Sequence, residues 1–78
     1  MDTNFIISLD SIADVNAFAN TIAHFKSEID LSSGRYIVNA KSIMGIFSLD
    51  LTRPLTLTVH GKDELKEISS AIAPYLKK

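Results

Sequence analysis

Three sets of side chains in this chain have the types and spacing for chemistry, beginning with its two histidines. His24 is followed by Glu28 four positions later, and His60 comes directly before Gly61. An imidazole can bind a metal ion or transfer a proton. The two histidines are distant in the sequence, with no cysteine and no clustered carboxylates beside them. We therefore expect two solvated surface histidines and no metal site.

The second set is a pair of carboxylates, Asp10 and Asp14, which could in principle act as an acid and a base. Ser11 and Asp14 also have the spacing of a capping box, with Asp in place of the usual Glu. Acidic side chains are favoured at the positive end of a helix dipole. The pair therefore predicts the start of a helix rather than a catalytic dyad.

Ser42 is the third candidate, because it opens the apolar segment IMGIFSL. Serine is a preferred N-cap residue, and a phosphate attached at a helix N-terminus meets unpaired N–H groups and the positive end of the dipole. Ser42 is thus a candidate for a helix cap and for a phosphorylation site. Ile43, Met44 and Phe47 give the segment more apolar surface than one core needs. They can be either core residues or a patch that a partner protein covers.

The elements that position these residues follow from the periodicity of apolar side chains. A period of two predicts four strands, over residues 4–9, 28–32, 35–40 and 54–60. Three- and four-residue spacing predicts helices over 11–26 and 63–76, with a short helix from residue 42. The order β-α-β-β-α-β-α predicts an α+β two-layer sandwich, with helices on one face of an antiparallel four-stranded sheet. The strand order stays open, because the ferredoxin-like fold has the same β-α-β-β-α-β core.

Composition predicts a single small domain. The chain has 78 residues, of which 46% are hydrophobic and 22% charged, so residues 1–78 are expected to form one domain. The absence of cysteine excludes disulfides and thiol chemistry, and a net charge of −1 leaves no basic face for nucleic acid. No segment is apolar and long enough for a membrane span or a signal peptide. We expect a cytoplasmic protein without a cofactor, in which Lys77 and Lys78 form a solvated tail.

The stretch VNAKSIMGIFSL, from Val38 to Leu49, closely resembles the segment around the regulatory serine of HPr, the phosphocarrier of the bacterial phosphotransferase system, and of its catabolite-repression paralogue. The resemblance extends to FIISLDS, FKSEIDL, the Gly34 turn and VHGKDE, and so covers nearly the whole chain. It implies an HPr-like open-faced sandwich with the strand order 1-4-2-3.

In the HPr family, a histidine at the start of the first helix, followed closely by Ala, Arg and Pro, accepts a phosphoryl group and passes it on. The corresponding stretch here is DSIADVNAF. Aligned forward, Asp14 falls at the histidine and Asn16 at the arginine, and aligned backward the loop is about three residues shorter. Neither alignment restores the motif. The resemblance therefore predicts a degenerate phosphohistidine loop, marked by Asp10, Ser11, Asp14 and Asn16.

Ser42 matches the family residue that HPr kinase/phosphorylase phosphorylates in low-GC Gram-positive bacteria, after which the carrier binds the catabolite-control repressor. Ile43, Met44 and Phe47 match the apolar docking patch of the family. The resemblance thus predicts a regulatory or adaptor protein that is not an enzyme and acts through the surface around Ser42. Two alternatives remain: a phosphocarrier that uses His24, His60 or Asp14, and a degenerate binding module for an unrelated partner.

Overall fold

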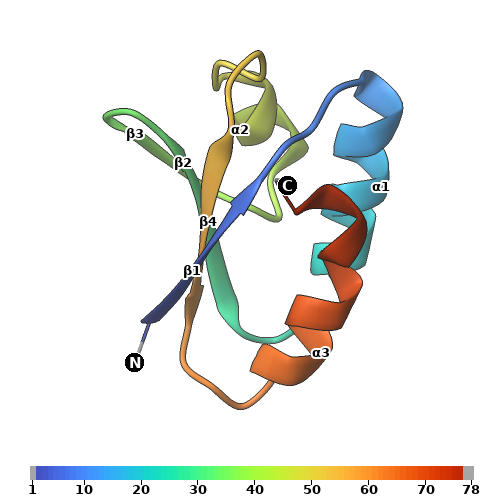
Figure 1. Ribbon diagram of the computed structural model, residues 1–78, viewed down its shortest axis with the longest axis vertical. Coiled ribbons are helices and arrows are strands. Elements are labelled where there is room, and N and C mark those ends of the chain that lie inside the picture. The colour runs from blue at the N-terminus through green and yellow to red at the C-terminus, as the bar shows by residue number, and fades with distance from the viewer. Residues whose placement is uncertain (1, 77–78) are drawn as a thin grey trace.

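The computed structural model describes residues 2–76, which form a four-stranded sheet with its helices on one side (Figure 1). Lys77 and Lys78, expected to form a solvated tail, lie outside the described residues. No helix within residues 2–76 is long and apolar enough to cross a membrane. The elements, in chain order, are β1 (Asp2–Ile7), α1 (Ile12–Ile22), β2 (Glu28–Ser33), β3 (Tyr36–Asn39), α2 (Ile43–Phe47), β4 (Leu55–His60), α3 (Leu65–Ala71) and the 3₁₀-helix η1 (Ala73–Tyr75).

The sheet has the order β1-β4-β2-β3, and every neighbouring pair is antiparallel. This confirms the predicted two-layer α+β sandwich and the strand order that the family resemblance implies. The ferredoxin-like alternative is excluded. Leu57 of β4 lies in register with Phe5 of β1 and with Leu31 of β2, so the apolar rows of three strands meet on the side of the helices.

Alternation explains the central strand β4, and turn chemistry explains the hairpin that joins β2 to the edge strand β3. β4 alternates strictly between buried and half-buried residues, as the sequence predicts. Gly34 has a φ of 60°, which lies in the left-handed region that favours glycine, and it closes the β2–β3 hairpin. The hairpin is therefore set by local sequence, while the pairing of β2 with β4 is set by burial.

Three predicted boundaries are wrong for identifiable reasons. β1 ends at Ile7 instead of residue 9, because the Ser8 N–H leaves the ladder and donates to the Tyr75 carbonyl at 2.8 Å. α1 ends at Ile22 instead of residue 26. The turn that follows is tighter than an α-helix, because the Phe25 N–H donates to the Ile22 carbonyl, three residues earlier, at 3.1 Å. The last helix stops at Ala71, and Pro74, which has no N–H, lies in the separate turn η1.

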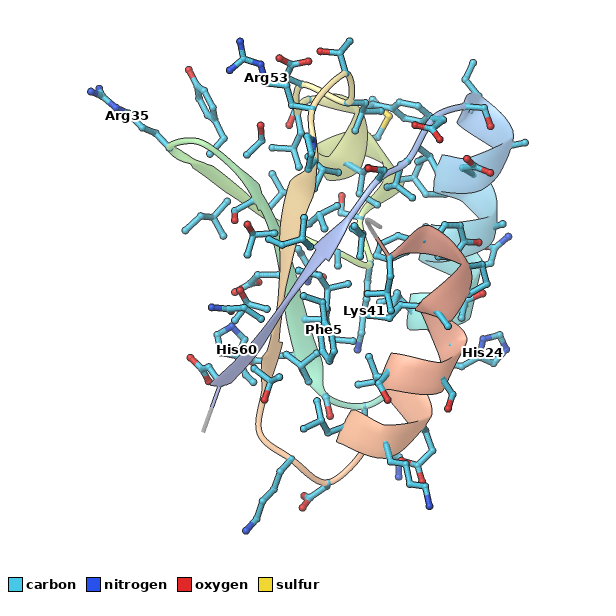
Figure 2. All side chains as sticks on the ribbon, in the orientation of Figure 1. Phe5, His24, Arg35, Lys41, Arg53 and His60 are labelled. Carbon is cyan, nitrogen blue, oxygen red and sulfur yellow. The ribbon has the colours of Figure 1, made fainter. Side chains whose placement is uncertain are left out.

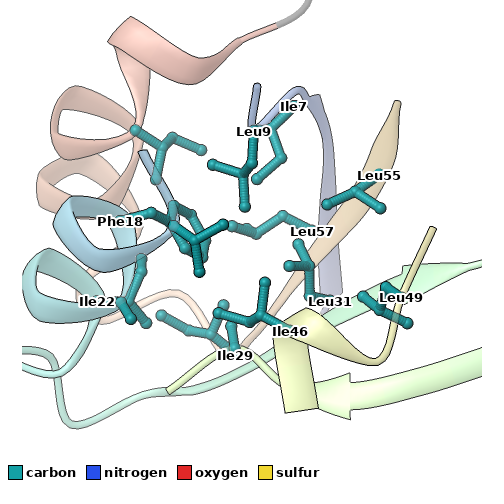
Figure 3. Packing of buried hydrophobic residues seen from close by; sticks show 14 of the residues in the cluster. Ile7, Leu9, Phe18, Ile22, Ile29, Leu31, Ile46, Leu49, Leu55 and Leu57 are labelled. Carbon is teal, nitrogen blue, oxygen red and sulfur yellow. The ribbon is translucent and has the colours of Figure 1, made fainter. Parts of the chain in front are cut away.

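A single hydrophobic cluster fills the space between the sheet and the helices (Figure 3). Phe18 of α1 is fully buried in it, and its ring meets Tyr75 edge-on, with ring centroids 5.6 Å apart and planes at 90°. The fully or almost fully buried side chains come from every layer of the fold: Ile7, Leu9, Val15, Phe18, Ala19, Ile22, Ile29, Leu31, Ala40, Ile46, Leu49, Leu55, Leu57, Val59, Ile68 and Ile72.

Candidate functional site

The start of α1 is built by the residues of the predicted degenerate loop. Ser11 is the N-cap, and its hydroxyl oxygen accepts the Asp14 N–H at 3.1 Å. The Asp14 carboxylate in turn accepts the Asp10 N–H at 3.2 Å. In a standard capping box, the side chain at this position accepts the N–H of the cap residue, which is Ser11 here. The Asp14 carboxylate instead accepts the N–H of Asp10, one residue earlier. Asp14 is thus bonded to the backbone of its own loop, while Asn16 is exposed on α1.

Ser42 is the N-cap of α2 and is exposed. Its hydroxyl oxygen accepts the Gly45 N–H at 3.1 Å, and its own N–H donates to the Asn39 carbonyl at 3.0 Å. A Cβ at position 45 would lie 3.2 Å from the Ser42 hydroxyl oxygen and 3.2 Å from the Val38 Cβ. Gly45 therefore allows the start of α2 to pack closely against β3, and this packing presents the serine hydroxyl at the surface.

The apolar residues of α2 divide between the core and the surface. Ile46 is fully buried, whereas Met44 is 81% exposed, Phe47 41% and Ile43 36%. The sequence left open whether the last three belong to the core. The structure places them at the surface, next to Ser42. We call Ser42, Ile43, Met44 and Phe47 the α2 surface.

A shallow depression of about 530 Å³ joins the α2 surface to the start of α1. Both elements lie at the same end of the sandwich (Figure 1). The sequence analysis did not identify Ile12, which is 69% exposed, or Leu51 as part of this surface. Ile12 lies three positions before Val15, so sequence spacing groups it with the core face of α1 although it projects beyond the core. The lining residues are Leu9, Asp10, Ser11, Ile12, Phe47, Leu51 and Thr52.

The two histidines lie away from this surface and from each other (Figure 2). His24 is exposed just after α1, with its Nδ1 2.8 Å from the Asn20 carbonyl oxygen. His60 is not the freely solvated histidine that we expected: its Nδ1 lies 3.1 Å from an Asp2 carboxylate oxygen and its Nε2 lies 2.7 Å from one of Asp30. The bond to Asp30, and then the bond to Asp2, raise the pKa of His60 above its ordinary value of 6.5.

Within residues 2–76, no group of three or more histidine or carboxylate side chains is arranged to hold a metal ion. The two ring nitrogens of His60 instead point to two different carboxylates on opposite sides of the ring. The arrangement suits hydrogen bonding of an imidazolium more than convergence on a cation.

The family model for the HPr component of the phosphotransferase system, described as "PTS HPr component phosphorylation site", matches residues 14–77. The chain therefore belongs to the HPr family of phosphotransferase-system phosphocarriers, whose members are not enzymes. The match includes Ser42 and the α2 surface, and it begins at Asp14, after β1 and the loop that follows it. The search of curated proteins gives no match.

Solved structures of HPr proteins share the fold over nearly the whole chain. HPr-C-His from Thermoanaerobacter tengcongensis is 29% identical with a TM-score of 0.70, and the alignment covers 95% of this chain and 88% of that one. The phosphocarrier HPr of Bacillus anthracis str. Ames is 28% identical with a TM-score of 0.70, over 99% and 96% of the two chains. The histidine-containing phosphocarrier of Mycoplasma, at 18% identity and a TM-score of 0.69 over 100% of both chains, shares the fold.

Proposed function

We propose that this chain is a regulatory or adaptor member of the HPr family, which acts through the α2 surface and does not relay phosphoryl groups through a histidine. The observation that carries the proposal is the exposed Ser42 hydroxyl at the start of α2, beside the exposed side chains of Met44 and Phe47. These residues lie within the stretch that the family model matches. By family resemblance, the partners are HPr kinase/phosphorylase and the catabolite-control repressor.

The loop before α1 supports the loss of the histidyl relay. A relay needs a nucleophilic imidazole near the N-terminus of the helix, where N–H groups and an arginine can stabilise the phosphoryl group. This loop has Asp10 and Ser11, the first turn of α1 has Asp14, and the nearest histidine, His24, follows the opposite end of the helix. The Asp14 carboxylate is bonded to the Asp10 N–H, in the role of a cap.

Phosphorylation of Ser42 would change the charge of the α2 surface at its edge. A phosphoserine carries a charge of about −1.5 to −2 at pH 7. The added charge would lie next to Ile43 and Met44, so a partner that covers these apolar side chains would meet it directly. Regulation of docking by Ser42 therefore needs no change in the fold.

The test is incubation of the full chain with HPr kinase/phosphorylase and ATP, followed by intact-mass measurement. We expect one phosphate on the wild type and none on Ser42→Ala. Ser48→Ala is the matched control, because Ser48 is an exposed serine at the other end of α2, where its hydroxyl donates to the Gly45 carbonyl at 2.6 Å. This control should accept the phosphate as the wild type does. An unmodified wild type would refute the proposed seryl regulation.

A phosphocarrier that uses His24, His60 or Asp14 is distinguished by incubation with enzyme I and phosphoenolpyruvate. We expect no transfer, because none of the three lies free at the start of α1. Acid-labile phosphate on any of them would contradict the regulatory proposal and would indicate that the protein relays phosphoryl groups.

The depression beside Phe47 favours one second candidate, a binding module for an unrelated partner. It is lined by exposed apolar side chains from two elements, and Ser42 is not among its lining residues. Affinity capture with the wild type, Phe47→Asp and Ser42→Ala separates the two functions. Loss of all partners in Phe47→Asp, with the same partners retained by Ser42→Ala and by phosphorylated protein, would favour the binding module.

A further inference from the structure

On the face of the sheet opposite the helices, the register of the strands arranges the side chains in rows that run across the strands. One row, Asn4–Thr58–Asp30–Asn39, is polar, and its Thr58 hydroxyl donates to the Asn4 side-chain oxygen at 2.8 Å. The next row, at the end of the sheet where β1 begins, consists of Asp2, His60 and Glu28. His60 lies in the middle of this last row, with an edge strand on one side (Figure 2).

His60 bonds to two strands at once. Its Nδ1 faces Asp2 of β1 at 3.1 Å, and its Nε2 faces Asp30 of β2 at 2.7 Å. Ionised carboxylates only accept hydrogen bonds, and a neutral imidazole has a single N–H. Loss of the ring proton therefore leaves a nitrogen lone pair facing a carboxylate oxygen. The imidazolium form alone donates to both carboxylates.

We infer that His60 is a proton-dependent clasp, which fastens the first residues of the edge strand β1 to the centre of the sheet and releases them when the ring loses its proton. The inference is independent of the proposed function, because His60 lies at the opposite end of the sandwich from the α2 surface (Figures 1 and 2).

The charged groups around the ring favour its protonated form. Asp2 faces it from β1, and β2 contributes Asp30 and also Glu28, which lies in register with His60. Within residues 2–76, no helix covers this face (Figure 1). The hollow at the end of β4, which His60 helps to line, has two cationic and two anionic side chains, whose formal charges cancel: Lys26, Lys62, Asp63 and Glu64. The three carboxylates of β1 and β2 therefore make the electrostatic potential at the His60 ring negative.

The direction of the pH effect follows from linkage. The hydrogen bonds to Asp30 and Asp2 raise the pKa of His60 above 6.5 in the folded protein. A group with a raised folded pKa stabilises the fold fully below its unfolded pKa, and this contribution is lost as the pH rises through the folded pKa. The clasp is therefore closed in mildly acidic solution and opens on the alkaline side of the folded pKa.

The opening is confined to the start of β1. Asn4 is held separately by the Thr58 hydroxyl, and Ile7 is fully buried, so both remain attached when His60 is neutral. We therefore expect loosening at Asp2 and Thr3 without unfolding of the sheet.

The experiment uses the full chain in a His24→Gln background, which leaves His60 as the sole histidine. Its ring signals are followed by NMR against pH in the folded protein and in urea. We expect a higher midpoint in the folded protein, and a fall in the protection of the Thr3 backbone N–H from exchange as the ring deprotonates. Exchange at Leu57, which stays in the sheet, corrects for the intrinsic effect of pH.

Asp30→Asn should lower the folded midpoint of His60 and move the loss of β1 protection to the same lower pH. Asp63→Asn is the matched control, because Asp63 lines the same hollow and, within residues 2–76, makes no hydrogen bond to the ring. It should leave both readouts nearly unchanged. Equal midpoints in the folded and unfolded protein would overturn the inference, as would β1 protection that is independent of His60 titration or equal responses to the Asp30 and Asp63 substitutions.

Discussion

A single carboxylate oxygen of Glu64 connects two loops that are distant in the sequence. It accepts hydrogen bonds from the Ser27 N–H at 2.7 Å, the Lys26 N–H at 2.8 Å and the Ser27 hydroxyl at 2.9 Å. Glu64 is the N-cap residue of α3, but its side chain does not cap that helix. Its carboxylate instead holds Lys26 and Ser27, the two residues directly before β2. The bonds from Ser27 are the main reason that the pKa of Glu64 lies below its ordinary value of 4.5.

The first prediction concerns acid stability. A lowered folded pKa gives stabilisation that is present above the unfolded value and is lost as the pH falls through the folded value. The free energy of unfolding of the wild type should therefore fall more steeply between about pH 5 and pH 3 than that of Glu64→Gln. Urea denaturation at each pH measures this. Ser27→Ala, which removes one of the three donors, should be intermediate, and parallel wild-type and Glu64→Gln curves would contradict the account.

At the scale of the elements, alternation and helical spacing were sufficient to predict the type and order of the strands and helices, since burial on one face imposes the period. The ends were not predictable, because they depend on distant partners: the Tyr75 carbonyl takes the Ser8 N–H, and Pro74 divides the last helix. The cap at Ser42 is local and was predicted. The bonds of His60 span 58 and 30 residues, so they need the strand register as well as the sequence.

The second prediction concerns the packing of α2. Glycine within a helix normally costs about 1 kcal/mol relative to alanine. Gly45→Ala should nevertheless destabilise the protein, because the new Cβ would lie 3.2 Å from the Val38 Cβ, which belongs to a strand and cannot rotate away. Denaturation midpoints measure the change, and circular dichroism checks the helix content. A gain of about 1 kcal/mol would show that α2 moves easily from β3.

Across the whole molecule, the sheet has two unlike faces, and almost all the stabilising burial is on one of them. The helices cover the apolar face, and the side chains of Phe18, Leu31 and Leu57 have no exposed surface. The α2 surface lies at one end of this sandwich and His60 at the other (Figures 1 and 2). Changes at either end should therefore leave the core intact.

The third prediction compares two apolar residues of α1. Phe18→Ala should lower the free energy of unfolding by about 3 to 5 kcal/mol, because it leaves a cavity in the core and removes the edge-on contact with Tyr75. Ile12→Ala should change it by about 0.5 kcal/mol or less, because Ile12 is 69% exposed. Chemical denaturation compares the two variants. A similar cost at both positions would mean that Ile12 is packed in solution.

The hydrogen bond of Asp14 has an evolutionary consequence. A single substitution, Asp14→His, would place an imidazole near the start of α1, at the position that the forward alignment with the family assigns to its histidine. The same substitution would remove the acceptor of the Asp10 N–H, and a protonated imidazole would meet the positive end of the helix dipole. Under the proposed function, a return to a histidyl relay through this substitution would pass through a less stable intermediate. A second, compensating change in the loop would then be needed to recover the lost stability.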